Sequence, residues 1–347
     1  MNDRHVVHVV RSDGFAGVER YIADAAAELS RRGWRVTVIG GDPAAMRREL
    51  PDQIAHEPAA TVGQTYRALR SVGRCDIVHA HMTAAELPAA LLKKRARARL
   101  VVTRHFVARR GSSPAGRVAA RLIERRMDLQ IATSRFVAAA TSSPSVVVHN
   151  GVRTSDEQAD RELVVVMMQR LEREKDTATA IRAWAVSGLA GQGWRLTVHG
   201  NGSEQGALRE LCTSLGVADA VELAGFTDDA HAALRSAEIF LTTAVADAFG
   251  LAVVEAMAEA TPVVATGAGA HPETLGVDGA YFEVGDADGC AAALNRLAAA
   301  PEERRAIGVR LRDRQRQLFS IESHVDQLES LYRVQLAHRD ERERTHG

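Results

Sequence analysis

Short apolar runs alternate with longer amphipathic runs along the whole chain. The short runs are rich in β-branched residues and nearly continuous, as in His-Val-Val-His-Val-Val at 5–10, which is typical of parallel strands covered on both faces. The longer runs place apolar residues at helical spacing. We therefore expect strands at 5–10, 35–39, 76–79, 99–104, 129–133, 145–148, 163–168, 194–199, 220–223, 238–242 and 262–265. Helices are expected at 18–32, 61–72, 83–97, 117–127, 134–140, 176–187, 203–215, 228–236, 250–260, 288–299, 301–318 and 321–337.

This alternation predicts an α/β protein with two tandem Rossmann-like domains, each a doubly wound parallel sheet. A length of 347 residues suits two domains of ordinary size. The polar segment 150–161 marks the division, so we expect domains at 1–155 and 156–320, and a charged, mobile tail at 341–347. Ligands of such folds bind at the carboxyl ends of the strands, and a cleft in which the two domains face each other is the expected site.

The net charge of zero conceals two halves of opposite sign. Residues 1–155 carry 25 Lys and Arg against 13 Asp and Glu, whereas residues 156–290 carry 8 against 22. Twelve of the basic residues lie at 93–126, with Glu124 as the one acid among them. This stretch is interpreted either as a solvated face or as a surface for an anionic acceptor or an anionic membrane. Binding of nucleic acid is not expected, because the stretch contains a single aromatic residue, Phe106.

No apolar run reaches the roughly 18 residues of a membrane span, and the first residues lack the features of a signal peptide. The three cysteines, Cys75, Cys212 and Cys290, are far apart and indicate neither a disulfide framework nor a metal site. A cytoplasmic location is therefore expected, with peripheral contact to the inner membrane face through 93–126 as an option.

The segment 247–265 carries the most functional information. Asp247 and Glu255 lie eight positions apart around Phe249-Gly250-Leu251, followed by an Ala-rich helical run and an apolar strand. A Gly at a loop-to-helix junction lets the backbone approach a ligand and leaves free helix N–H groups. The arrangement suits a ligand with both an anionic group and hydroxyls, such as a nucleotide sugar. The alternative is a helix with solvated acids.

The segment resembles the signature of retaining glycosyltransferases of family 4, in which two acids are separated by seven residues and the fold is GT-B. It departs from that pattern at Asp247, where a Glu is usual, and at Ala260, where a Gly is usual. The resemblance implies that Glu255 accepts hydrogen bonds from the ribose hydroxyls and that Asp247 binds a donor-sugar hydroxyl. It also places the backbone amides of Phe249, Gly250 and Leu251 at the sugar and phosphate. Because Asp is shorter than Glu, the loop moves in, a water bridges, or the donor sugar differs from the usual one.

A second stretch, Gln169-Arg170-Leu171 to Lys175-Asp176, follows the strand expected at 163–168. It resembles Gly-Arg-Leu-x-x-x-Lys-Gly of the family, in which the Arg and the Lys clamp the donor diphosphate. The resemblance implies that Arg170 and Lys175 stabilise the leaving diphosphate in place of a metal ion, as preorganised cations can. No Asp-x-Asp metal motif occurs, so neither a metal ion nor a cofactor is expected. Exposed residues that form salt bridges are the alternative.

Motifs in the first half are less specific. Gly17 lies in Ala16-Gly17-Val18-Glu19-Arg20, which resembles the family's Gly-Gly-x-Glu-Arg and puts Gly17 beside the donor diphosphate or the acceptor. His105 ends a strand, and the resemblance implies that it hydrogen-bonds and orients the donor sugar. His79 and His81 are interpreted either as lining the floor of the cleft or as satisfied core residues.

Two further features lie in the second half. Phe226 follows the strand expected at 220–223, where the family positions the nucleobase, and is interpreted either as part of the wall of the base pocket or as core. Gly200, Gly202 and Gly206, with Glu222 as a ribose acid, also allow a dinucleotide-binding loop.

Together these features predict a metal-independent retaining glycosyltransferase of the hexosyltransferase type. Its donor is a nucleotide-diphosphate sugar, with a UDP-sugar as the first choice, and its acceptor is a hydroxyl of a glycan, a lipid or a small molecule such as a secondary metabolite. The resemblance also implies that the helix at 321–337 crosses back to the first domain. The alternatives are an NAD(P)-binding oxidoreductase, a non-catalytic nucleotide-sugar-binding protein, and another GT-B enzyme such as a sugar phosphorylase or an epimerase.

Overall fold

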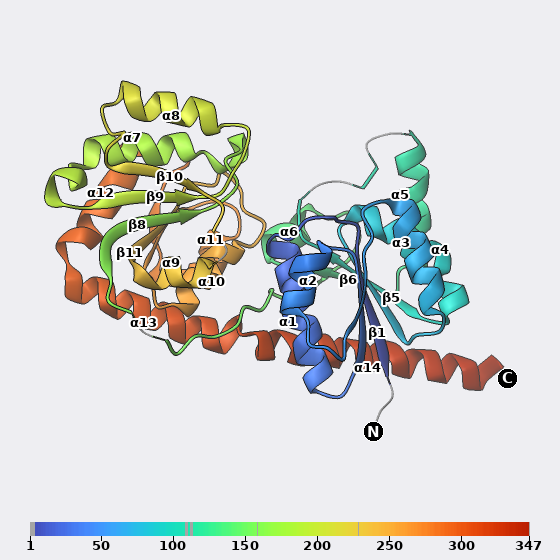
Figure 1. Cartoon of the computed structure of the whole chain (residues 1–347). Coiled ribbons are helices and arrows are strands. Elements are labelled where there is room, and N and C mark those ends of the chain that lie inside the picture. The colour runs from blue at the N-terminus through green and yellow to red at the C-terminus, as the bar shows by residue number, and fades with distance from the viewer. Residues whose placement is uncertain (1–3, 108–109, 112–113, 158, 228, 347) are drawn as a thin grey trace. The chain divides into compact units, whose positions relative to one another are not determined.

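The computed structural model describes residues 4–107, 110–111, 114–157, 159–227 and 229–346. The chain forms two compact units (Figure 1): unit 1 contains Met1–Gly151 and Ser320–Gly347, and unit 2 contains Val152–Phe319. Each unit holds one sheet in which all paired strands are parallel. The predicted fold class, two Rossmann-like α/β domains, is confirmed.

Unit 1 has a seven-stranded sheet with the order β3-β2-β1-β4-β5-β6-β7. Its strands are β1 (His5–Val10), β2 (Arg35–Ile39), β3 (Ala55–Glu57), β4 (Ile77–His81), β5 (Arg99–Arg104), β6 (Leu129–Ala132) and β7 (Val146–Val147). Its helices are α1 (Gly17–Arg31), α2 (Pro43–Glu49), α3 (Val62–Val72), α4 (Thr83–Ala96), α5 (Pro114–Arg126), α6 (Arg135–Ala140) and α14 (Ile321–His346).

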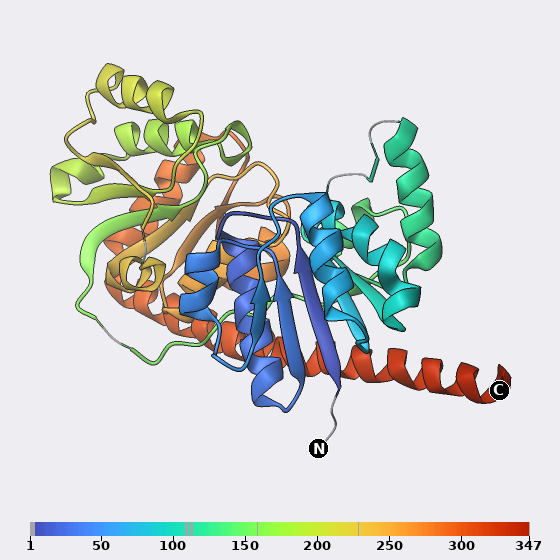
Figure 2. The ribbon, with the colours of Figure 1, turned by 45° about the vertical axis from the view of Figure 1, so that its right-hand side comes forward.

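Side-chain alternation along the strands decides which helices each face of this sheet meets. On β1, Val6 and Val10 pack in one apolar cluster with residues of α1, α2 and α14, whereas Val7 and Val9 pack in another with residues of α3 and α4. The views in Figures 1 and 2 show α14 beside α1. His8 has the same parity as Val6 and therefore belongs to the face that α1 and α14 cover.

Unit 2 has a six-stranded sheet with the order β10-β9-β8-β11-β12-β13. Its strands are β8 (Glu162–Met168), β9 (Arg195–His199), β10 (Val221–Gly225), β11 (Ala237–Thr242), β12 (Val263–Thr266) and β13 (Ala280–Phe282). Its α-helices are α7 (Thr177–Ser187), α8 (Gln205–Ser214), α9 (Ala230–Ser236), α10 (Leu251–Ala258), α11 (His271–Leu275), α12 (Ala287–Ala299) and α13 (Pro301–Leu318). Helices α7, α8 and α12 lie on one face, and α9, α10 and α13 on the other (Figure 1).

Several elements differ from the expectation. The helices α2 and α11 and the strands β3 and β13 were not expected, because they span only three to seven residues and show no full period of a pattern. The sequence does contain a start signal for α2, because Asp42 stands directly before Pro43 and these two residue types favour the N-cap and the first position of a helix. In the structure the Asp42 side chain accepts hydrogen bonds from the N–H groups of Ala44 and Ala45. The end expected for the last helix, 337, was wrong, because α14 continues to His346.

Within the described residues, no helix has both the length and the hydropathy that a membrane span needs.

Candidate functional site

An ion pair joins two of the predicted site residues at the carboxyl edge of the unit 2 sheet. Lys175 ends a 3-10 turn (Arg173–Lys175) after β8, and Asp247 lies in the loop from β11 to α10. Lys175 Nζ donates to Asp247 Oδ2 at 2.8 Å. Residues 72 positions apart in the chain therefore meet where ligands of parallel α/β sheets bind.

The surroundings of Asp247 favour its ionised form. Burial alone would raise the pKa of this carboxyl, but the charge and hydrogen bond of Lys175, with a smaller effect of His271, leave the pKa below its usual value. His271 Nε2 lies 3.9 Å from Asp247 Oδ2, is buried and has no hydrogen-bond partner among the described residues. Burial lowers the pKa of His271, so the imidazole is neutral near pH 7.

Two side chains hold the backbone of Lys175. Its carbonyl oxygen accepts a hydrogen bond from Gln169 Nε2 at 3.2 Å and another from Thr243 Oγ1 at 2.8 Å. Gln169 also donates to Thr177 Oγ1 at 2.9 Å. The residue that replaces the first Gly of the resembled motif therefore takes part in positioning Lys175.

The loop that carries Asp247 is fastened along its length. The Val245 N–H donates to the Glu174 carbonyl at 3.1 Å, and the Ala270 N–H donates to the Asp247 carbonyl at 2.9 Å. Gly269 has a φ of 61°, and a Cβ there would lie 2.5 Å from the Asp247 carbonyl oxygen. The close packing of Gly269 and the hydrogen bonds together preorganise the loop.

Helix α10 begins at the end of this loop with unsatisfied N–H groups. Gly250, its N-cap, has a φ of 81°, which favours glycine, and no side chain caps the helix. Free amides at such a start attract an anion. Glu255 follows at the fifth helical position, and its carboxylate has no hydrogen-bond or ion-pair partner among the described residues. Phe249 contributes only backbone here, because its ring is buried against Phe319.

Two other predicted ligand residues are exposed. The Arg170 side chain is 65% exposed and pairs with Glu174 at 2.7 Å, so it does not join the Lys175–Asp247 pair in this structure. Phe226 follows β10 and is 63% exposed, which overturns the alternative that its side chain packs in the core. A solvent-facing ring is available to stack on a planar ligand.

Close backbone packing explains two of the three glycines, Gly200 and Gly202, that also allowed the interpretation as a dinucleotide-binding loop. A Cβ on Gly200 would lie 1.9 Å from the Gln169 carbonyl oxygen, and one on Gly202 would lie 2.2 Å from the Leu171 carbonyl oxygen. These glycines therefore allow the end of β9 to approach the end of β8. Gly206 lies inside α8, away from that contact.

In unit 1, His105 is only 6% exposed, and its Nε2 lies 3.1 Å from His81 Nδ1. His79 and His81 are fully buried with their ring nitrogens hydrogen-bonded, so the interpretation as satisfied core residues is confirmed and that of a cleft floor is wrong. His8 was not predicted as a site residue, although its Nδ1 lies 2.9 Å from His81 Nε2. The sequence held one signal for this position: His8 lies two positions from each of Val6 and Val10, so its side chain points to the same buried face of the sheet.

Gly17 is the first residue of α1, and the N-cap Ala16 offers no side-chain hydrogen bond. The Ala16 N–H instead donates to Glu19 Oε2 at 3.0 Å. The start of α1 thus already contains a carboxylate, unlike the start of α10.

The basic stretch divides into paired and exposed residues. Asp128 pairs with Lys93 and Arg99, and the buried Glu86 pairs with Arg104 and Arg110. The exposed basic residues are Lys94, Arg95, Arg97, Arg117, Arg121 and Arg125. Arg109 lies outside the described residues.

Two family models together match most of the chain. Residues 15–156 match the family model described as "Glycosyltransferase Family 4", and residues 152–314 match the model "Glycosyl transferases group 1". The fold is that of a GT-B protein. The chain belongs to the glycosyltransferases of the family 4 type.

Two curated relatives match about two-fifths of the chain. The MMP α-(1→4)-mannosyltransferase of Mycolicibacterium hassiacum is 37% identical over 137 residues, which cover 38% of this chain and 33% of the relative. The lipopolysaccharide core biosynthesis glycosyltransferase LpsE of Rhizobium meliloti is 33% identical over 138 residues, 39% of each chain. The matched segments thus span little more than a third of these relatives.

Among solved structures, Anabaena HepE in complex with UDP and glucose is similar with a TM-score of 0.77 and 22% identity, covering 94% of this chain and 98% of HepE. At that identity the likeness shows the fold.

Proposed function

We propose that the protein is a retaining, metal-independent glycosyltransferase that moves a sugar from a nucleotide-diphosphate sugar, a UDP-sugar in the first instance, to a hydroxyl of a glycan, a lipid or a small molecule. The proposal rests on one observation. Lys175 pairs with Asp247, and Asp247 lies in the loop that leads directly into the uncapped start of α10. HepE, a structural neighbour with the same fold, is in complex with UDP and glucose, which supports the choice of UDP.

Each group has a chemical task in this proposal. The Lys175 ammonium and the Arg170 guanidinium bind the diphosphate and stabilise the charge that gathers on it when the sugar leaves. The free amides from Gly250 onward add hydrogen bonds to the phosphate and sugar. Glu255, one turn further, accepts hydrogen bonds from two ribose hydroxyls with a carboxylate that is otherwise unpaired. These cations and amides take the part that a metal ion has in other transferases.

Asp247 has the same task toward the sugar as the longer Glu of the family. Because Lys175 already binds Asp247 Oδ2, the ammonium can contact the diphosphate and orient the carboxylate at once. The carboxylate also accepts a hydrogen bond from the Ala248 backbone N–H, and its remaining lone pairs accept a sugar hydroxyl in this proposal. Phe226 stacks on the base in this proposal, and His105 of unit 1 donates to the sugar.

The exposed basic residues of α4 and α5 support an additional proposal, that unit 1 touches an anionic membrane surface where a lipid acceptor would lie. Arg117, Arg121 and Arg125 recur every fourth residue on α5, so they form one stripe. Val118, which is 65% exposed, lies next to this stripe.

Two alanine substitutions test the donor site. We expect Glu255→Ala and Lys175→Ala each to lower donor turnover by at least about tenfold, since each removes a charge-assisted contact of roughly 1.5–3 kcal/mol. Turnover is measured as release of nucleoside diphosphate from a panel of nucleotide sugars, first selected by thermal shift. The anomeric configuration of the product, determined by NMR, tests retention.

The matched control is the ion pair of Arg195 and Glu162. These residues begin β9 and β8, so they lie at the amino ends of the strands, whereas the proposed site lies at the carboxyl ends. Arg195→Ala removes a positive charge, as Lys175→Ala does, and Glu162→Ala removes a negative charge, as Glu255→Ala does. Because both control residues are exposed, each control variant should keep turnover within about twofold of wild type. Full turnover in both site variants would show that the donor binds elsewhere. Phosphate-dependent cleavage of a glycoside would instead favour a phosphorylase, and NAD(P)H binding without nucleotide-sugar binding an oxidoreductase.

A further inference from the structure

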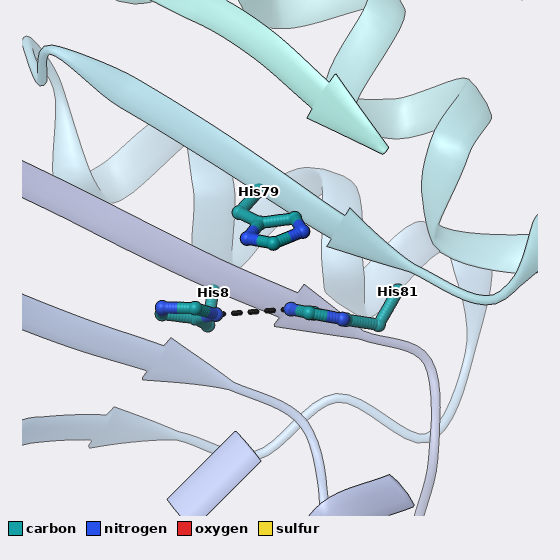
Figure 3. Close-up of side chains that lie close together, drawn as sticks. All are labelled: His8, His79 and His81. Carbon is teal, nitrogen blue, oxygen red and sulfur yellow. Dashed lines mark hydrogen bonds between the residues drawn. The ribbon is translucent and has the colours of Figure 1, made fainter. Parts of the chain in front are cut away.

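Three imidazoles form a hydrogen-bonded row across neighbouring strands of unit 1. His8 Nδ1 lies 2.9 Å from His81 Nε2, as Figure 3 shows, and His81 Nδ1 lies 3.1 Å from His105 Nε2. His8 is on β1, His81 ends β4 and His105 directly follows β5, and these strands are adjacent in the sheet. We name these three residues the histidine row.

All three rings are neutral near pH 7. Burial lowers the pKa of His8 to about 3, and burial with the nearby His324 lowers the pKa of His105 to about 3. Burial and the neighbouring histidines lower the pKa of His81 well below its usual value. A neutral imidazole has one donor and one acceptor nitrogen. The two hydrogen bonds therefore allow only two arrangements, in which every proton lies toward His105 or every proton lies toward His8.

The two ends of the histidine row are not equivalent. His8 Nε2 is completely buried and has no hydrogen-bond partner among the described residues. His105 Nδ1 also has no hydrogen-bond partner among the described residues, and His105 keeps 6% of its surface exposed whereas His8 and His81 are fully buried. His105 is therefore the end of the row that solvent or a ligand can approach. With the protons toward His8, its Nε2–H would be an orphaned buried donor, which is rarer in proteins than an unpaired acceptor and costly. With the protons toward His105, the His105 Nδ1–H lies at the end of the row that is not fully buried and can donate to a ligand there.

We propose that His8 and His81 are positioning residues that hold His105 as an Nδ1–H donor for an oxygen atom of a bound ligand. The identification of that ligand as the donor sugar rests on the proposed function. The positions of the protons in the histidine row do not depend on the proposed function. In this state His105 donates a hydrogen bond and cannot act as a base through Nδ1.

Surrounding side chains hold the rings in place. The Tyr21 ring of α1 meets both His81 and His105 edge-on, with centroids 5.8 and 5.4 Å apart. The Tyr21 hydroxyl donates to His324 Nε2 at 2.9 Å, because His324 Nδ1 already donates to the His149 carbonyl at 2.6 Å. Tyr21 is therefore fixed by α14, and it limits rotation of the row.

A metal ion is the competing interpretation, since His8, His79 and His81 each place a nitrogen within 4.8 Å of the others. A metal lies in the plane of an imidazole, along the nitrogen lone pair. The rings of His79 and His81 are instead tilted against each other, with centroids 4.2 Å apart and 32° between planes, and Figure 3 shows His79 beside the line from His8 to His81. Both His79 nitrogens are already engaged, one by Thr103 Oγ1 at 2.6 Å and one by the Tyr332 hydroxyl at 2.5 Å. The geometry favours the hydrogen-bonded row.

The first measurement needs no substitution and no ligand. In ¹⁵N-histidine-labelled wild-type protein at pH 7, long-range N–H correlations distinguish Nδ1–H from Nε2–H, and His105→Gln assigns the signals of His105. We expect His105 to carry its proton on Nδ1. An Nε2–H or doubly protonated His105, or zinc retained at one equivalent after purification and bound by the row, would overturn the proposal.

Substitutions of His8 provide the second measurement. The amide of Asn can occupy the place of Nδ1 and donate to His81 Nε2, whereas Leu cannot. We expect His8→Asn to keep the His105 Nδ1–H signal, and His8→Leu to give a mixture of tautomers. In the Leu variant kcat/KM should fall about threefold to tenfold, because one hydrogen bond is lost. In the Asn variant kcat/KM should stay near the wild-type value.

Failures of the two proposals are distinguishable. The expected tautomer without turnover of any nucleotide sugar would leave the histidine row standing and refute the proposed function. Turnover with identical tautomers in the Asn and Leu variants would refute the row. If neither variant folds, the wild-type tautomer alone decides.

Discussion

Ala260 shows how a single residue departs from the pattern of its family and what that costs. It follows the C-cap of α10 with a φ of 55°, a conformation that favours glycine. The Thr261 N–H donates to the Ala256 carbonyl at 2.9 Å and the Ala260 N–H to the Met257 carbonyl at 3.0 Å, which is the Schellman arrangement. The usual Gly therefore has a backbone reason, and Ala260 carries strain without a change in the path of the chain.

We predict that Ala260→Gly stabilises unit 2 by about 1 kcal/mol, the cost of a left-handed conformation for a residue with a Cβ. Urea unfolding of wild type and variant measures the difference. Ala292→Gly, at an exposed position inside α12, is the matched control and should destabilise by about 1 kcal/mol. Equal effects of the two changes would contradict the argument.

Helix α5 is the element whose composition best fits an external partner. Its exposed Arg117, Arg121 and Arg125 form one stripe, and none of them has an ion-pair partner among the described residues. By contrast, Glu86 and Asp128 neutralise the basic residues at the inner side of the same region. Unpaired cations on one helix face are attracted to anionic lipid headgroups.

We predict that the protein sediments with phosphatidylglycerol-containing vesicles at low salt and not with pure phosphatidylcholine. Replacing the three α5 arginines by alanine should weaken binding about 100-fold, because each contributes about 1 kcal/mol near an anionic surface. The control replaces the exposed Arg182, Arg195 and Arg209 of unit 2, which removes the same net charge. Undiminished binding of the α5 variant would show that α5 is a solvated face.

On the scale of the whole molecule, the two units differ in their response to acid. Burial lowers the pKa of His8 and His105 to about 3, and of His324 to about 4, in unit 1. Unfolded histidines take up protons near pH 6.5, so below that pH the unfolded state binds more protons than the folded state and stability falls. In unit 2 burial lowers the pKa of His199 and His271 in the same way, and the lowered pKa of Asp247 contributes stability that is lost only below about pH 4.

We predict that unit 1 loses stability first as the pH falls from 7 to 5. Five buried histidines of unit 1 have a lowered pKa, namely His8, His79, His81, His105 and His324. Each should lower the free energy of unfolding of unit 1 by roughly 1.4 kcal/mol per pH unit well below pH 6.5. Hydrogen exchange in urea, followed in peptides from β1 and β4 against β8 and β11, measures each unit separately.

A variant pair checks the origin of this slope. His324→Gln removes one of these five buried histidines and should reduce the pH slope of unit 1 by about a fifth. His338→Gln, at an exposed position of α14, should leave the slope unchanged. A wild-type stability that stays constant between pH 7 and 5 would contradict the prediction.

The sequence by itself determined the fold class and most of the elements, because alternating β-branched strands and amphipathic helices have different periods that local residues carry. It also indicated Lys175 and Asp247, Gly250 and Glu255 through motifs whose spacing is local. Short elements such as β3 and α11 escaped, since three to five residues hold no full period.

Only the tertiary structure decided which distant residues meet. The Lys175–Asp247 pair and the support of the Lys175 carbonyl by Gln169 and Thr243 depend on strand order, which places β8 next to β11. The histidine row likewise requires β1, β4 and β5 to be neighbours. Burial of these imidazoles depends on α14, which follows the whole of unit 2 in the chain and yet covers unit 1. Contacts between segments so far apart are set by packing, and no local pattern of residues encodes them.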